Sequence, residues 1–120
     1  MKKTFFCLLA LFYFGLPEVK SQTLNDIPIK DINVQYLQIV GRALNSGRAF
    51  DIEIDFGQAT KIFSSKETRV KDENGKSVKF NSMIDALNLF CKNGYKFVTV
   101  YVNSSAERPI YYYLLEKTSK

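Results

Sequence analysis

Hydrophobic and polar residues alternate along much of this chain, which is the pattern of strands that bury one face. The alternation is clearest over residues 50–56, where acidic positions separate hydrophobic ones: Asp51, Glu53 and Asp55 against Phe50, Ile52, Ile54 and Phe56. A similar alternation begins at Ile32 and becomes hydrophobic on both faces up to Val40. The glycine-flanked residues 41–47 predict a hairpin loop between these two strands. Residues 22–30, which contain Pro28, predict an irregular lead-in.

A second hairpin is predicted over residues 69–80. Its turn is Asn74-Gly75, because these residue types supply the positive φ that a tight hairpin turn requires. Residues 61–64, just before it, predict a short extended piece.

The hydrophobic period then changes from that of a strand to that of a helix. One amphipathic helix is predicted from Ser82 to Asn93, with Ser82 as the N-cap, Asp85 completing a capping box and Asn93-Gly94 as the C-cap. Its hydrophobic stripe consists of Met83, Leu87 and Phe90.

Two strands follow the helix. Residues 95–102 are hydrophobic on both faces, which predicts a central strand, and residues 110–115 predict the return strand. The fold class is therefore α+β, with a largely antiparallel sheet in the order β-β-(β-hairpin)-α-β-β and one amphipathic helix on one face. A single domain is expected over residues 31–117.

The stretch IDALNLFCKNGYKFV, residues 84–98, ends a helix in glycine plus an aromatic residue and leads into an apolar strand. With the tyrosine-rich final strand, it resembles the C-terminal half of small exported bacterial proteins of the Bacteroidota kind, which have no assigned function. The resemblance implies this helix-to-strand arrangement and implies no activity.

The start of the chain predicts a cleavable secretory signal over residues 1–21. Lys2 and Lys3 precede an uncharged apolar run, residues 5–16, that Pro17 ends, and this run is shorter than the roughly 20 residues of a spanning helix. The small side chain of Ser21 makes it the best cleavage position. We therefore expect an exported protein, periplasmic or extracellular, with no membrane span after cleavage.

Charge is concentrated in one segment. Residues 61–79 carry six basic and three acidic side chains, and the rest of the chain after the signal is balanced. The second hairpin therefore offers a candidate surface for an anionic glycan or lipid, or for an acidic protein: Arg69, Lys71, Lys76 and Lys79. The competing interpretation is that the acidic strand at residues 51–55 lies beside this hairpin and neutralises it. Nucleic acid is not expected as a partner outside the cytoplasm.

Most catalytic chemistry is excluded by composition. The chain has no histidine, so no catalytic triad or histidine-ligated metal can form, and no cofactor or metal is expected. The carboxylates Asp51, Glu53 and Asp55 could serve glycoside hydrolysis, but a charged outer strand face is the commoner reason for such a stripe. Once the signal is removed, Cys91 is alone, either as a structural thiol or in an intermolecular disulfide.

Tyrosines form a second candidate contact surface. Tyr111 and Tyr113 share one face of the last strand, and Tyr95 and Tyr101 share one face of the strand before it. If the helix leaves a sheet face open, these rings suit contact with proteins or sugars; otherwise they complete the core.

The function predicted from sequence is that of an exported, non-catalytic binding or interaction module. Its partner would be another envelope protein, an anionic glycan or lipid, or a second copy of the chain. The alternative is a small carboxylate-dependent enzyme, or an enzyme inhibitor, acting on cell-envelope polymers.

Overall fold

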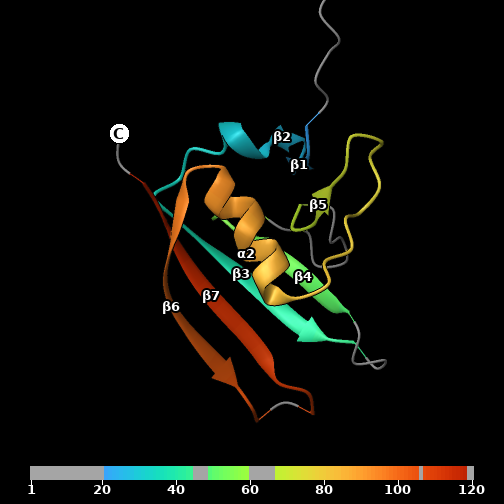
Figure 1. Ribbon diagram of the computed structural model, residues 1–120, viewed down its shortest axis with the longest axis vertical. Helices are drawn as coiled ribbons and strands as arrows, with labels where there is room; N and C mark the ends of the chain where they lie inside the picture. Colours follow the sequence, from blue (N-terminus) through green and yellow to red (C-terminus); the bar gives the residue numbers. More distant parts are fainter. Residues whose placement is uncertain (1–20, 45–48, 60–66, 106, 119–120) are drawn as a thin grey trace, which may run out of the picture.

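Four antiparallel strands with one helix across them form the main body of the molecule in the computed structural model, which describes residues 21–44, 49–59, 67–105 and 107–118 (Figure 1). A smaller sheet of three short strands lies beside one end of the helix. The predicted α+β class, antiparallel sheet and covering helix are all confirmed. In chain order the elements are β1 Thr23–Leu24, β2 Ile27–Pro28, the 3-10 turn η1 Ile29–Asp31, β3 Tyr36–Ala43, β4 Phe50–Asp55, β5 Val70–Lys71, α2 Met83–Lys92, β6 Tyr95–Asn103 and β7 Ile110–Lys117.

The four-stranded sheet has the order β4-β3-β7-β6. Paired residues of antiparallel strands point to the same face, so the pairing fixes two faces. Ile39 pairs with Ile54 and Tyr113 on the face toward α2, whereas Val40 pairs with Glu53 and Tyr112 on the opposite face. The first is called here the helix side and the second the open face.

The hydrophobic core lies between α2 and the helix side of the sheet. Its fully buried side chains are Leu24, Leu37, Ile39, Ile54, Val70, Phe90 and Leu115. Leu24 comes from β1 and Val70 from β5, which pair with each other, so the small sheet closes one side of the same core.

Helix α2 begins and ends where the sequence predicts. The hydroxyl oxygen of Ser82 accepts a hydrogen bond from the Asp85 amide at 3.2 Å, and the Asp85 carboxylate accepts one from the Asn81 amide at 3.0 Å. The first bond satisfies one of the N–H groups that the start of a helix leaves without a partner, and the second satisfies the amide of Asn81, just before the helix. Met83, Ala86 and Phe90 are buried against the sheet.

The strand β4 also matches its prediction, with Ile52 and Ile54 buried on the helix side and Asp51, Glu53 and Asp55 on the open face.

The second hairpin is present, since the Val78 amide donates to the Val70 carbonyl. Its turn differs in detail: the Gly75 amide donates to the Asp72 carbonyl, and Gly75 has φ +78° whereas Asn74 is not in the left-handed region. One glycine in the left-handed region therefore suffices for this longer turn.

Three local predictions are corrected. Residues 22–30, expected to be irregular, contain β1, β2 and the start of η1, and Ile29 is buried. The first long strand begins at Tyr36 and not at Ile32, because Ile32 caps η1. The expected extended piece at 61–64 and the expected signal at 1–21 lie outside the described residues except for Ser21.

Gly41 belongs to β3 and not to the hairpin loop expected over residues 41–47. A Cβ at this position would overlap the Met83 sulfur and lie 3.1 Å from Cδ1 of Ile52. Glycine in a strand often marks a place where another element comes close. Here it lets the first turn of α2 rest directly on the backbone of β3.

We predict that Gly41→Ala lowers the free energy of unfolding by about 1–3 kcal/mol, because the added methyl displaces Met83. In a Met83→Ala background the same methyl enters vacated space, so the double variant should lose less than the sum of the two single variants. Urea denaturation of the four proteins measures this difference. Additive losses would contradict the close contact between Gly41 and Met83.

The strand β6 lies at the edge of the sheet and is not the central strand that its hydrophobic sequence predicts; β7 is central. Tyr95 is the one residue of β6 that is buried. Its ring packs edge-on against Phe90, and its hydroxyl donates to the carbonyls of Val34 at 3.0 Å and Ile32 at 3.3 Å. Burial raises the pKa of the Tyr95 phenol above its usual 10.0.

We predict that Tyr95→Phe lowers the free energy of unfolding by about 1 kcal/mol near neutral pH, the typical net value of a lost hydrogen bond. The folded state holds the phenol proton more tightly than the unfolded state. The stabilisation is therefore present below pH 10.0 and is lost as the pH rises through the pKa of the folded state. The difference between the wild type and Tyr95→Phe should narrow above pH 10.0 in urea titrations; a constant difference would contradict this assignment.

Candidate interaction surface

The acidic stripe of β4 is held by arginines on the open face. Asp51 forms an ion pair with Arg69, and Glu53 lies 3.5 Å from Nη1 of Arg42 and 4.0 Å from Nη2 of Arg69. The hydrogen bond with Asp51 raises the pKa of the Arg69 guanidinium. The Asp55 carboxylate accepts a hydrogen bond from the Gly57 amide at 3.0 Å. Each carboxylate of the stripe thus has a partner within the fold.

A shallow hollow on the open face adjoins this stripe, bounded by Glu53, Asp55 and Tyr112. Gln58 also lines it, but its side chain accepts from the Phe56 amide and donates to the carbonyls of Ile54 and Glu67. The side chains of Glu53, Asp55 and Gln58 in the hollow are therefore all engaged by groups of the protein itself.

The four predicted basic residues differ in their surroundings. Arg69 is committed to Asp51 and Glu53, as the neutralisation interpretation expects. Lys71 lies half-buried on β5, Lys76 is exposed at the turn, and Lys79 is exposed after it. Three lysines therefore remain without the arginine as the candidate basic surface: Lys71, Lys76 and Lys79.

The ion pair of Asp51 and Arg69 remains in contact with solvent, because the two side chains are 28% and 31% exposed. We therefore predict that it contributes about 0.2–1 kcal/mol to the free energy of unfolding, the range typical of solvent-exposed pairs. A double-mutant cycle of Asp51→Asn and Arg69→Gln, followed by urea denaturation, measures the coupling. The coupling should shrink in high salt. A coupling of several kcal/mol that resists salt would show that this part of the open face is far more buried.

The four predicted tyrosines are divided between the two faces of the sheet. A β-bulge shifts the register of β6 between Phe97 and Thr99. Tyr95 therefore points to the helix side, whereas Tyr101 points to the open face, and the expectation that they share a face is wrong. Tyr111 and Tyr113 do share a face, the helix side, where both are half-buried.

On the open face, Tyr101 stacks on Tyr112, with ring centroids 4.4 Å apart and planes 6° apart. Tyr112 was not among the predicted contact residues. Its alternation with Tyr111 and Tyr113 in the sequence placed it on the opposite face of β7, but nothing local showed that Tyr101 would join it.

The strand β6 is the most exposed regular element among the described residues. Eight of its nine residues are exposed, and five of these eight have large hydrophobic side chains: Phe97 (44%), Val98 (44%), Val100 (42%), Tyr101 (57%) and Val102 (47%). Its outer edge has no neighbouring strand in the described sheet. Natural proteins commonly protect such an edge, because its free N–H and C=O groups pair readily with another chain.

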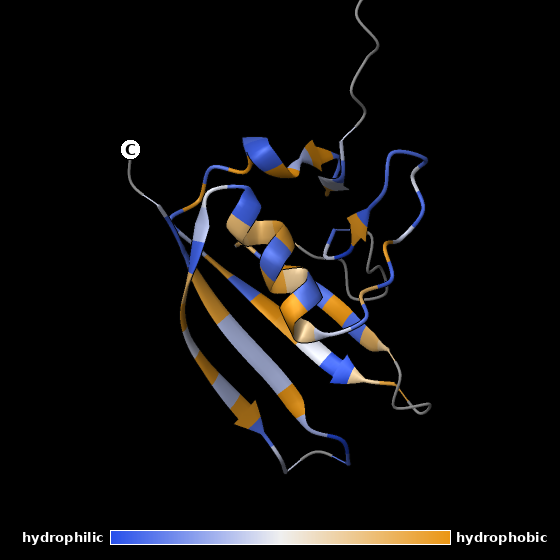
Figure 2. Cartoon of the chain, viewed as in Figure 1, coloured by the Kyte–Doolittle hydropathy of each residue, from blue (hydrophilic) through white to orange (hydrophobic). Residues whose placement is uncertain are grey.

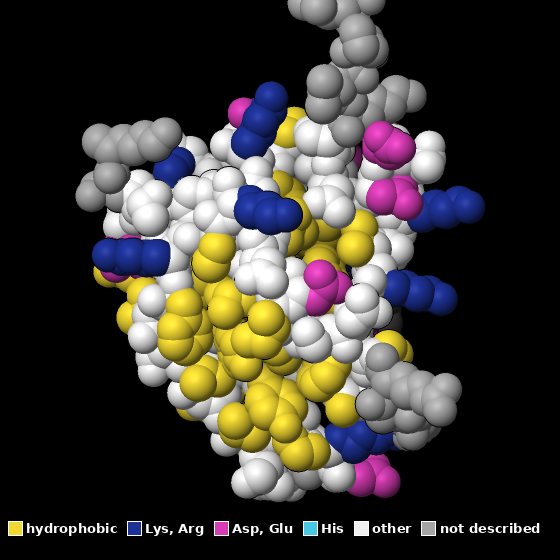
Figure 3. All heavy atoms as spheres, in the orientation of Figure 1, with side chains coloured by type: hydrophobic (Ala, Val, Ile, Leu, Met, Phe, Trp, Pro, Cys, Tyr) yellow, Lys and Arg dark blue, Asp and Glu magenta, His cyan; other side chains and the backbone are white. Residues whose placement is uncertain are grey.

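Beside this edge, the helix side carries a continuous hydrophobic surface, visible in Figure 3 over β6 and β7 below the helix. Figure 2 shows hydrophobic residues continuing along β6 to its tip, past the part of the sheet that α2 covers. The helix adds Ile84, which is 54% exposed. We call this surface the apolar face; it consists of Ile84, Phe97, Val100, Val102, Tyr111 and Tyr113.

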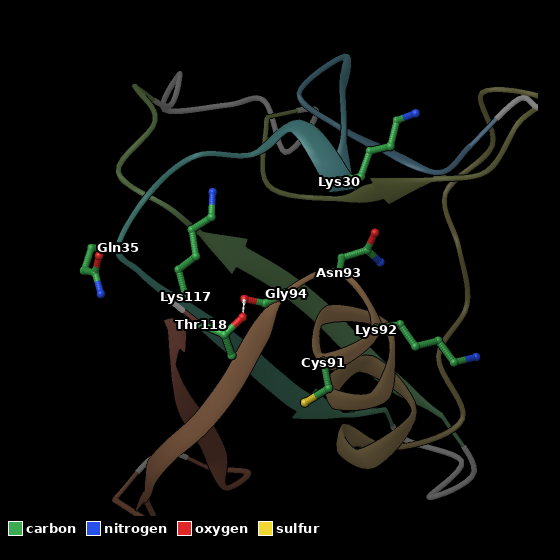
Figure 4. A pocket seen from close by; sticks show the side chains of 8 residues that line it. All are labelled: Lys30, Gln35, Cys91, Lys92, Asn93, Gly94, Lys117 and Thr118. Carbon is green, nitrogen blue, oxygen red and sulfur yellow. Dashed lines mark hydrogen bonds between the residues drawn. The ribbon is translucent and has the colours of Figure 1, made fainter. Parts of the chain in front are cut away.

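Cys91 is exposed on α2, and its side chain points toward β6 in Figure 4. It lines one edge of a surface hollow at the helix C-terminus that also includes Lys30, Lys92 and Lys117. Lys117 donates to the Asn33 side chain at 2.7 Å, and Lys92 points away from the other two lysines. These lysines therefore do not converge on a common ligand.

Within the residues that the structure describes, no group of histidine, cysteine, aspartate or glutamate side chains could hold a metal ion. No helix among them is long and apolar enough to cross a membrane. Comparisons with protein-family models, with characterised proteins and with solved structures found no significant match to this chain.

Proposed function

We propose that this chain is a non-catalytic protein-interaction module that acts after export and binds its partner through β6, using the free edge of the strand and the adjoining apolar face. The observation that carries the proposal is the exposure of eight consecutive residues of an edge strand, five of them large and hydrophobic. Exposed hydrophobic patches on soluble proteins usually mark interaction sites, and free strand edges bind other strands by extending the sheet.

The competing functions have less support. For a carboxylate-dependent enzyme, Asp51 and Glu53 would have to be free to act on substrate, yet both are paired with arginines on an open strand face. Catalytic carboxylates more often lie in concave, partly apolar sites. For an anion-binding surface, Arg69 would have to be available, and it is engaged by the same carboxylates.

A photo-cross-linking experiment tests the proposal in the cells that naturally make the protein. A benzophenone analogue of phenylalanine is placed at Phe97 on the apolar face, at Tyr101 on the edge strand, or at Tyr36. Tyr36 is the matched control, because it is 52% exposed but lies on β3, which β7 separates from β6. We expect one discrete adduct from positions 97 and 101 and none from position 36.

Val100→Lys, combined with the probe at position 101, should reduce the adduct by about tenfold, the usual cost of losing an important contact residue. Lys79→Gln, on the exposed hairpin, should leave the adduct unchanged. Adducts of equal yield from all three probe positions, or none from positions 97 and 101, would refute the role of β6.

A further inference from the structure

The free edge of β6 is protected over only part of its length. At its start, Lys96 is charged and lies 3.7 Å from Glu116, and the bulge next to Val98 interrupts the regular edge. Charges and bulges are the usual devices that prevent strands from pairing edge to edge. Residues 99–103 have neither device, nor a proline. This five-residue window is the part of β6 that is open to a new strand.

The window is self-complementary when it is placed antiparallel to a copy of itself. Pairing with β7 puts Val100 and Val102 on the helix side and Thr99, Tyr101 and Asn103 on the open face. An antiparallel copy centred on Tyr101 then sets Val100 opposite Val102 and Thr99 opposite Asn103, with Tyr101 opposite its own counterpart. The two members of each pair share a face, as in any antiparallel pairing centred on one residue, and here they are also alike in type. No charged residue occurs between Phe97 and Ser105.

We infer that two copies of this chain pair through residues 99–103 of β6 about a two-fold axis at Tyr101, forming one continuous sheet of eight strands. The inference rests on the proposed function of β6 and names its partner as a second copy. A two-fold interface requires one surface to fit itself, and this window does so in the types of its paired residues and in its lack of charge. An unrelated strand would have to match the same pattern independently.

The surroundings of the window favour this arrangement. The stacked rings of Tyr101 and Tyr112 lie on the open face, so the dimer places four tyrosines in a row across the junction. Such aromatic cross-strand neighbours stabilise antiparallel pairing. Figure 1 shows the exposed end of β6 extending away from α2, so no described element stands between two approaching edges.

The expected affinity is moderate. A five-residue strand junction with its flanking side chains buries less than the roughly 800 Å² per partner of a standard stable interface. We therefore expect a dissociation constant on the order of micromolar rather than nanomolar. Joining the two edges also places the two apolar faces on the same side of the extended sheet.

The test is a charge-swap experiment with the purified protein, as its own cells process it, in analytical ultracentrifugation. The wild type should change from monomer to dimer across the micromolar range. Tyr101→Lys and Tyr101→Glu should each weaken self-association by at least about 100-fold, because like charges then face each other at the axis. An equal mixture of the two should recover a dimer containing one copy of each. Tyr36→Lys is the matched control and should dimerise like the wild type.

A second measurement fixes the register with a different substitution. In a Cys91→Ser background, Tyr101→Cys should form a disulfide-linked dimer under mild oxidation, because opposed residues of antiparallel strands have Cα atoms about 4.5–5.5 Å apart, within the range of a disulfide. Thr99→Cys should not, because the two copies of residue 99 are offset by four residues, or about 13 Å. Thr99→Cys combined with Asn103→Cys should cross-link again.

Three results would overturn the inference: a wild-type protein that stays monomeric up to millimolar concentration, a dimer that Tyr101→Lys leaves intact, or cross-linking of Thr99→Cys in preference to Tyr101→Cys. If the protein is monomeric while photoprobes on β6 still capture a different protein in its native cells, the inference fails and the proposed function stands. If neither experiment detects a partner at β6, both fail.

Discussion

Helix α2 is too small to cover the sheet on which it packs, and the surface properties of the molecule follow from this mismatch. A ten-residue helix is about 15 Å long and about 10 Å across, whereas strands of eight or nine residues run for nearly 30 Å and four of them span about 14–19 Å. The helix buries β3, β4 and the start of β6. The far halves of β6 and β7 keep hydrophobic side chains on the helix side with no described element above them.

The two faces of the sheet are covered by different kinds of side chain. The helix side is filled by aliphatic and aromatic side chains, and Gly41 lets the helix approach closely. The open face has no covering layer among the described residues, so it combines arginine–carboxylate pairs on β4 with the stacked pair of Tyr101 and Tyr112 at the other edge. Charge is thus satisfied at one edge of the sheet, while the opposite edge is hydrophobic and uncharged over residues 97–103.

This asymmetry leaves β6 with both the free edge and the exposed hydrophobic side chains on which the proposed interaction rests. The bulge beside Val98 protects the first part of the strand and, because it shifts the register by one residue, also turns Tyr101 onto the open face beside Tyr112. One irregularity therefore limits the length of edge that can pair and builds the aromatic pair at its centre. In the proposed interaction, specificity comes from the short window of β6 that remains open.

The sequence by itself determined the features that depend on neighbours close along the chain. The helix, its Ser82 cap, the two faces of β4, the hairpin at Gly75 and the α+β class all follow from local periodicity and turn chemistry. Only the tertiary structure decided which strand stands at the edge, why Gly41 lies within a strand, and which face Tyr101 occupies. A strand that is hydrophobic on both faces has the same local pattern whether its second neighbour belongs to its own sheet or is absent. Strand order and register are set by pairing between distant segments, and one bulge reverses every face assignment that follows it.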